Sequence, residues 1–70
     1  MRFSRHAKNN ARDLNASVED AECAIQDAFR VDVDYDGRPR YTSYIRGIRV
    51  RIVVALDDPD LIVTIHERRT

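Results

Sequence analysis

The sequence predicts an α+β domain in which two N-terminal helices pack on a four-stranded antiparallel sheet. Apolar residues recur at spacings of three and four up to residue 29, which is the period of a helix. From residue 31 to residue 67 they alternate with polar residues, which is the period of a strand. With 70 residues, 43% of them hydrophobic, and no linker, the chain is expected to form a single domain over residues 1–70.

The first helix is predicted over residues 4–14. Ser4 can accept a hydrogen bond as the N-cap. Ala7, Ala11 and Leu14 follow at spacings of four and three, so they form one apolar stripe.

The second helix is predicted over residues 17–29. Ser17 is the expected N-cap, and Asp20 stands three residues later, as in a capping box. Cys23 lies among small residues and is expected to be a buried thiol. The apolar face is formed by Val18, Ala21, Ile25, Ala28 and Phe29.

Four strands are predicted after the helices, over residues 31–36, 40–46, 48–56 and 61–67. They are separated by a turn at residues 36–39, a two-residue connection at residues 46–47 and a four-residue turn at residues 57–60. Val31, Val33 and Tyr35 are assigned to the side of the sheet that faces the helices.

These loop lengths and the apolar pattern predict two cross-strand rows of side chains on the face away from the helices. Opposed side chains in such rows are close enough to interact. The rows could be ordinary surface ion pairs, each worth about 0–1 kcal/mol, or a polar groove that binds a ligand. The expected rows are Asp34, Thr42, Arg51 and His66, and Asp32, Tyr44, Arg49 and Arg68, with Arg46 at the rim.

The charges balance overall but are distributed in blocks. Twelve basic residues, eleven of them arginine, face twelve acidic ones, which argues against a general nucleic-acid coat protein. A single cysteine excludes an internal disulfide framework. No apolar run approaches about 18 residues and no secretory signal follows Met1, so we expect a cytoplasmic protein without a membrane partner.

Three short segments resemble a small uncharacterised bacterial family with an N-terminal His-Ala helix. They are Phe3-Ser4-Arg5-His6-Ala7, Ser17-Val18-Glu19-Asp20 and Ile62-Val63-Thr64-Ile65-His66. The order of elements is similar to that of the RelE/ParE toxin superfamily. This resemblance implies two helices on an antiparallel sheet and a toxin paired with a cognate antitoxin. Many members of that superfamily are ribosome-dependent mRNA endoribonucleases, and others poison gyrase.

The resemblance also implies RNA cleavage without a metal or cofactor. His66 is the candidate acid or base, because its pKa is ordinarily near neutrality. Arg51 and Arg49 are candidate phosphate clamps, and Tyr44 could stack on a base or donate a proton. The remaining candidate binding residues are Arg46, Arg68, Arg40 and His6.

Each histidine also has a plainer interpretation. His66 could simply pair with Asp34 or Glu67 at the surface, and His6 could hydrogen-bond Asn10 one turn along its helix. The histidines and the cysteine lack the short spacing of a zinc site, so no metal is predicted.

Three hypotheses for the role of the chain stay open. The first is a toxin-like mRNA endoribonuclease. The second is a non-catalytic module whose polar sheet face binds protein or nucleic acid. The third is a homodimer formed through the strand at residues 31–36, since a core of this size stabilises a single chain only weakly.

Overall fold

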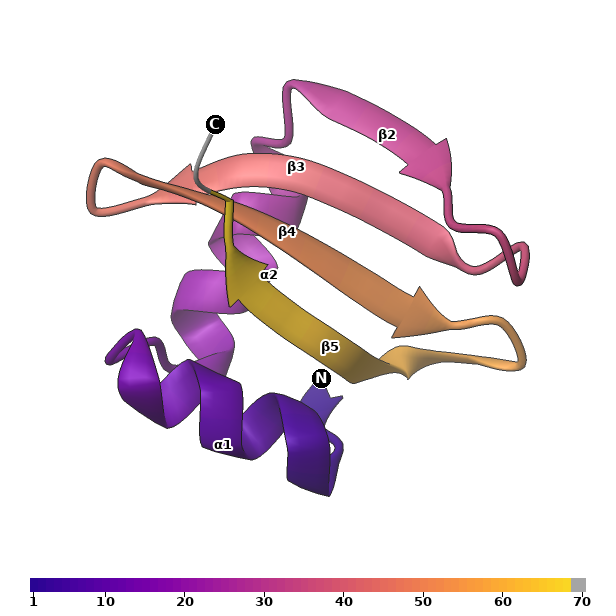
Figure 1. The fold of residues 1–70 in the computed structure, drawn as a ribbon, viewed down its shortest axis with the longest axis horizontal. Coiled ribbons are helices and arrows are strands. Elements are labelled where there is room, and N and C mark those ends of the chain that lie inside the picture. The colour runs from indigo at the N-terminus through magenta and orange to yellow at the C-terminus, as the bar shows by residue number, and fades with distance from the viewer. Residues whose placement is uncertain (69–70) are drawn as a thin grey trace.

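In the computed structural model, which describes residues 1–68, two helices pack against one face of a five-stranded mixed sheet (Figure 1). The strands lie in the order β1-β5-β4-β3-β2. α1 packs mainly against β5, and α2 packs against β3. The elements in chain order are β1 (Arg2–Phe3), α1 (Arg5–Asp13), α2 (Val18–Gln26), β2 (Arg30–Val33), β3 (Pro39–Ile45), β4 (Ile48–Ala55) and β5 (Asp58–Glu67).

The α+β class is confirmed, but the prediction of four antiparallel strands is wrong by one strand. β1 pairs with β5 in parallel, and Phe3 lies opposite Ile62. The backbone N–H of Ser4 extends this pairing by donating to the carbonyl oxygen of Ile62 at 2.9 Å. Two residues are too few to show an alternating pattern, so this strand has no signal of its own in the sequence.

Capping side chains set the boundaries of both helices. The hydroxyl of Ser4 accepts a hydrogen bond from the Ala7 N–H at 3.1 Å, as predicted for the first N-cap. At the second, Ser17 and Asp20 form the full capping box, with reciprocal bonds of 3.0 Å.

α2 ends at Gln26, three residues before its predicted end. The chain then crosses to the sheet, where the Phe29 N–H donates to the carbonyl oxygen of Thr42 at 3.1 Å. Phe29 therefore belongs to the sheet surface and not to the apolar stripe of the helix. The expectation for Cys23 is also wrong, because its thiol is exposed.

The β3–β4 hairpin has the predicted register. Arg46 and Gly47 form the two-residue connection with φ angles of 49° and 78°, as a type I′ turn requires. Ile45 lies opposite Ile48, and Tyr44 lies opposite Arg49.

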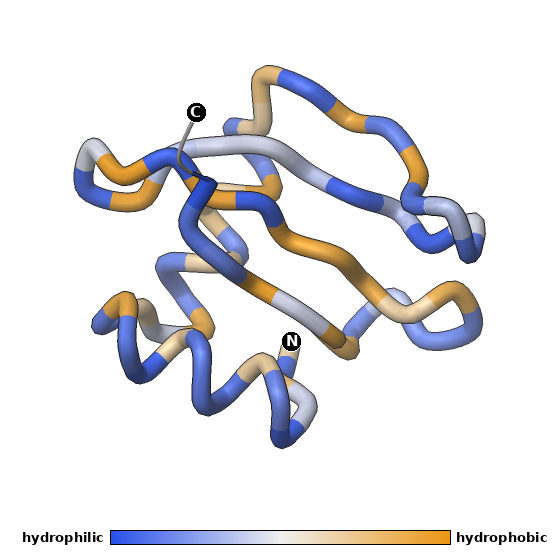
Figure 2. Tube along the Cα trace, in the orientation of Figure 1, coloured by the Kyte–Doolittle hydropathy of each residue, from blue (hydrophilic) through white to orange (hydrophobic). Residues whose placement is uncertain are grey.

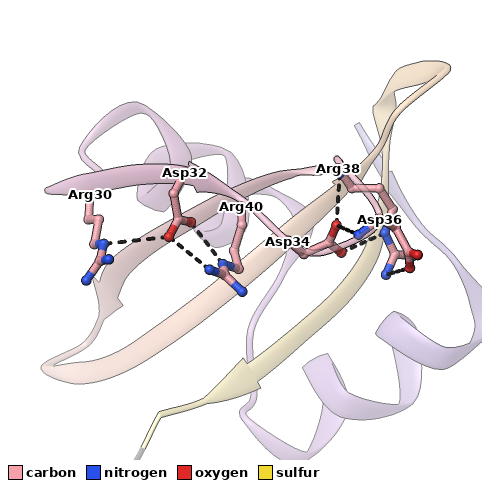
Figure 3. Close-up of polar contacts among 6 residues, drawn as sticks. All are labelled: Arg30, Asp32, Asp34, Asp36, Arg38 and Arg40. Carbon is pink, nitrogen blue, oxygen red and sulfur yellow. Dashed lines mark hydrogen bonds and ion pairs between the residues drawn. The ribbon is translucent and has the colours of Figure 1, made fainter.

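The β2–β3 hairpin does not have the predicted register. Asp32 lies opposite Arg40, whereas Tyr44 was expected there, and Asp34 lies in the turn instead of opposite Thr42. The carboxylate of Asp34 accepts hydrogen bonds from the backbone N–H groups of Asp36 and Arg38, so its side chain organises the turn (Figure 3). β2 therefore ends at Val33, before the predicted strand end at residue 36 and before the turn predicted from Gly37 and Pro39.

The predicted register of the β4–β5 hairpin is confirmed only in the part away from the turn. Arg51 lies opposite His66, as predicted. The predicted four-residue turn at residues 57–60 is wrong, because the turn is formed by residues 56–57 and β5 already begins at Asp58. Register shifts around Val54 absorb the difference and restore the predicted pairs beyond them.

The helices and the sheet contribute unequally to the core. The buried helical residues are all alanines, so the helices lie close to the sheet and the sheet supplies the bulk. The cluster consists of Ala7, Ala11, Ala21, Ala24, Ile45, Val50, Ile52, Val54, Ile62 and Ile65.

This core does not extend under β2. Hydrophobic and polar residues alternate along β2, as expected (Figure 2). Val31 and Val33 are nevertheless 62% and 60% exposed. Tyr35, in the turn, is 99% exposed. Val31 and Val33 point to the helix side of the sheet, as predicted, but they are not buried, because α2 packs on β3 and the edge strand projects beyond it.

Candidate functional site

The candidate site lies on the face of the sheet away from the helices, which we call the outer face. Strand alternation places two adjacent rows of side chains there. The second row is continued by Arg68, whose backbone N–H donates to the carbonyl oxygen of Arg49 at 2.8 Å. The rows are Arg30, Thr42, Arg51 and His66, and Tyr44, Arg49 and Arg68.

Neither predicted carboxylate lies in these rows. Asp32 lies opposite Arg40, and the guanidinium of Arg40 donates two hydrogen bonds of 2.9 Å to it (Figure 3). Arg30 lies 3.7 Å from the same carboxylate. These contacts, first of all the hydrogen bonds from Arg40, lower the pKa of Asp32. Asp32 is therefore ionised and neutralised by its partners, and Arg40 is occupied in holding it.

Arg49 and Arg51 are only half-buried, but each buries its Nε atom. Neither Nε donates a hydrogen bond to any atom of residues 1–68. Burial lowers the pKa of Arg51, and the nearby charges of Arg68 and Arg40 lower it further. A buried donor without an acceptor is unfavourable. The outer face therefore carries two buried N–H donors that a bound acceptor could satisfy.

An aromatic pair flanks the arginines. The rings of Phe29 and Tyr44 stack with their centroids 5.4 Å apart, and each residue is 55% exposed. The guanidinium carbon of Arg49 lies 5.7 Å from the centroid of Phe29, within range of a cation–π contact. The sequence reasoning missed both Phe29 and Arg30, because each joins the outer face through the actual end of α2 and the actual register of β2.

His66 lies at the other end of its row, next to Arg51. Burial lowers the pKa of its imidazole, and Arg51, Arg68 and His6 lower it further by repulsion. The ring is therefore neutral at pH 7 and can accept a proton. It also lines a pocket of about 370 Å³ together with Asn10, Asp13, Leu14 and Glu67.

Two predicted binding residues lie outside this cluster. His6 is exposed on α1, and its ring nitrogen lies 3.4 Å from the amide of Asn10, as in the plainer interpretation. Arg46 binds Asp20 at 2.9 Å and also donates to the carbonyl oxygens of Leu14 and Asn15. Arg46 therefore ties the β3–β4 turn to the connection between the helices.

Across residues 1–68, no three acidic, histidine or cysteine side chains gather as metal ligands. In the same part of the chain, no helix is both long and apolar enough to cross a membrane. A comparison with known proteins finds no matching family model, no matching curated protein and no matching solved structure. Any function has to be inferred from the geometry of the outer face.

Proposed function

We propose that the chain binds single-stranded RNA on its outer face. The observation that carries this proposal is the position of two half-buried arginines, whose Nε donors find no acceptor in residues 1–68, beside an exposed aromatic stack. The guanidinium groups can bind the phosphates of RNA, and the flat aromatic rings can stack on its bases.

The phosphate part of the proposal follows from the unpaired donors of Arg49 and Arg51. Arg68 lies near Arg51 and adds a third cation, and Asp32, whose carboxylate acts on Arg51, is already bound by Arg40. The planar guanidinium group matches phosphate in a bidentate geometry. A bound phosphate would therefore supply acceptors for these donors and negative charge beside the three cations.

The preference for a single strand follows from the aromatic pair. Phe29 and Tyr44 expose ring surface next to the arginines, and unpaired bases can stack on such rings. Bases in a duplex are already stacked and turn only their edges outward. The choice of RNA over DNA follows the expected resemblance to the RelE/ParE toxin superfamily, which rests on the sequence alone.

Replacing Phe29 or Tyr44 with alanine is expected to weaken binding of a short single-stranded RNA about 5- to 150-fold. This range corresponds to about 1–3 kcal/mol for one stacked base. Fluorescence anisotropy at fixed salt measures it, with a duplex and a DNA strand of the same sequence as further ligands. Tyr35→Ala is the matched control, because Tyr35 is 99% exposed in the turn. Equal losses in all three variants, or tighter binding of the duplex, would count against the proposal.

A second candidate function is metal-independent RNA cleavage, as in a toxin of a toxin–antitoxin pair. It is favoured by the neutral His66 opposite Arg51. In this reaction His66 takes the proton of a ribose 2′-hydroxyl, whose oxygen attacks the adjacent phosphorus. Arg51 and Arg49 stabilise the charged phosphate, and Tyr44 protonates the departing 5′ oxygen. The products are a 2′,3′-cyclic phosphate and a free 5′-hydroxyl.

If this chemistry occurs, His66→Gln is expected to lower the cleavage rate about 100-fold or more, as for the loss of a general base. On the acid side, the wild-type rate is expected to fall at a pH below the ordinary histidine pKa of about 6.5, because burial lowers the pKa of His66. RNA affinity is expected to rise over the same pH range, since a protonated His66 adds a cation.

End-labelled RNA resolved on a gel measures cleavage, and His6→Gln is the control for loss of an exposed histidine. Intact RNA after incubation with the wild-type chain and ribosomes would eliminate the nuclease and leave the binding proposal standing. Growth arrest on induced expression that requires His66 would support the toxin assignment.

A further inference from the structure

We propose that two copies of this chain pair through β2, antiparallel, with Val31 opposite Val31 of the second copy. This interface is separate from the proposed RNA site. It would join the two five-stranded sheets into one continuous sheet.

The backbone of β2 is available for this pairing. β2 is the last strand of the sheet, with β3 on one side only. The Asp34 N–H donates to the carbonyl oxygen of Arg38 at 3.0 Å. By the alternation of an antiparallel ladder, Asp32 and Arg30 also direct their backbone groups toward β3. Val31 and Val33 consequently direct theirs outward, where a further strand can bind.

On the helix side of the sheet, β2 carries only valines, and its charged residues Arg30 and Asp32 lie on the outer face. Natural edge strands are commonly shielded by lysine, proline or a covering element. Here Val31 and Val33 are 62% and 60% exposed on the side of the sheet that carries the helices. Pairing with a second copy in this register would bury the two Val31 side chains against each other.

The charges on the outer face select one register. Pairing centred on Val31 places Arg30 of each chain opposite Asp32 of the other, so two ion pairs flank the axis. Pairing centred on Asp32 would instead place the two Asp32 carboxylates opposite each other, which is unfavourable. A sequence of opposite charges on either side of an apolar residue, Arg30-Val31-Asp32, is thus complementary to itself in the antiparallel direction. This complementarity identifies a second copy of the chain as the occupant of the edge.

The two-fold axis of this pairing runs perpendicular to the sheet, so both outer faces lie on the same side. The arginine clusters of the two chains would form one surface. If the RNA proposal also holds, one strand of RNA could reach both sites.

Disulfide trapping tests the register directly. In a Cys23→Ser background, Val31→Cys is expected to form a cross-linked dimer under mild oxidation. The two Cα atoms of such a pair lie about 5.5 Å apart, within the range of a disulfide. Leu56→Cys is the matched control, since Leu56 is 68% exposed in the β4–β5 turn. Cross-linking of both variants to the same extent, or of neither, would overturn the assignment.

The mass in solution tests the interface in the native chain. Sedimentation equilibrium is expected to show a concentration-dependent shift from 8.1 kDa toward twice that mass. Val31→Lys and Arg30→Asp are expected to abolish the shift, and Arg12→Asp on the exposed face of α1 is expected to leave it unchanged. Circular dichroism verifies that each variant is folded.

Two outcomes would overturn the proposal. A wild-type chain that stays monomeric at every concentration would exclude the homodimer and leave the edge open to a strand of a different protein. A dimer that persists in Val31→Lys would place the interface elsewhere. RNA binding is measured separately, so either result is distinguishable from a failure of the RNA proposal.

Discussion

Arg51→Met is expected to raise the melting temperature of the chain while it removes most of the RNA affinity. Methionine retains the long unbranched stem but lacks the charge and the donors. The two effects have opposite signs because the same guanidinium group is unfavourable in the free fold and favourable in the complex.

The stability gain follows from the surroundings of Arg51. Its Nε is buried without an acceptor among the described residues, and its pKa is lowered by burial and by neighbouring arginines. A lowered pKa of a basic group means that the fold disfavours its charged form, and arginine stays charged at pH 7. Removing the charge is expected to add about 1 kcal/mol, which is about 4–8 °C in a domain of this size.

The loss of affinity follows from the contact that the phosphate would make. Hydrogen bonds to charged groups are worth about 1.5–3 kcal/mol, so binding is expected to weaken about 10- to 150-fold. The slope of affinity against salt is expected to fall by about 0.7 for each lost phosphate contact on a single strand. Thermal denaturation and anisotropy titrations at several salt concentrations measure both effects.

Two control variants separate charge from packing. Arg51→Lys keeps the charge but not the planar fork, so we expect it to retain the salt slope and lose part of the affinity. Arg12→Met removes an arginine from the exposed face of α1 and is expected to change neither quantity. If Arg51→Met lowers the stability of the chain and leaves its RNA affinity unchanged, Arg51 stabilises the fold and does not bind a ligand.

The accuracy of the sequence prediction differed between the hairpins for a physical reason. A two-residue loop leaves one way to pair β3 with β4, and that register is confirmed. The β2–β3 register was wrong, although the apolar pattern agreed with it. Any shift by an even number of residues keeps Val31 and Val33 on the same face, so alternation cannot distinguish the registers. The deciding interaction is local, between the Asp34 side chain and the backbone of its own turn.

That error changed the predicted chemistry of the candidate site. Thr42, Arg51 and His66 share a row as expected, and Tyr44 and Arg49 lie opposite each other in the next. The sequence-based prediction nevertheless placed two carboxylates, Asp32 and Asp34, in these two rows. In the structure Arg30 takes the place of Asp34, and the ring of Phe29 stacks against that of Tyr44. The outer face is consequently more cationic and more aromatic than the sequence suggested, while the roles of its residues stay predictions.

Ile52→Ala is expected to destabilise the chain more than any other substitution considered, because the sheet supplies most of the buried side-chain volume of the core. Ile52 is fully buried in β4, opposite Tyr41 on one side and Ile65 on the other. The fully buried residues of α1 and α2 are alanines, and longer helical side chains such as Ile25 pack against the cluster only partly buried, so little helical side chain is at hand to fill the space. Truncating a buried isoleucine to alanine costs about 2–5 kcal/mol, toward the upper end where the site cannot collapse.

Such a loss is a large part of the stability of a 70-residue chain, which is about 4–10 kcal/mol for a typical domain. We expect the melting temperature to fall by at least about 10 °C, measured by circular dichroism or urea denaturation. Ile52→Val removes one methylene and should cost only about 0.5–1.5 kcal/mol. Leu56→Ala is the exposed control, and its effect should lie within about 0.5 kcal/mol. Equal effects of Ile52→Ala and Leu56→Ala would contradict a core centred on β4. A graded series would show that the sheet, rather than the helices, sets the stability of this fold.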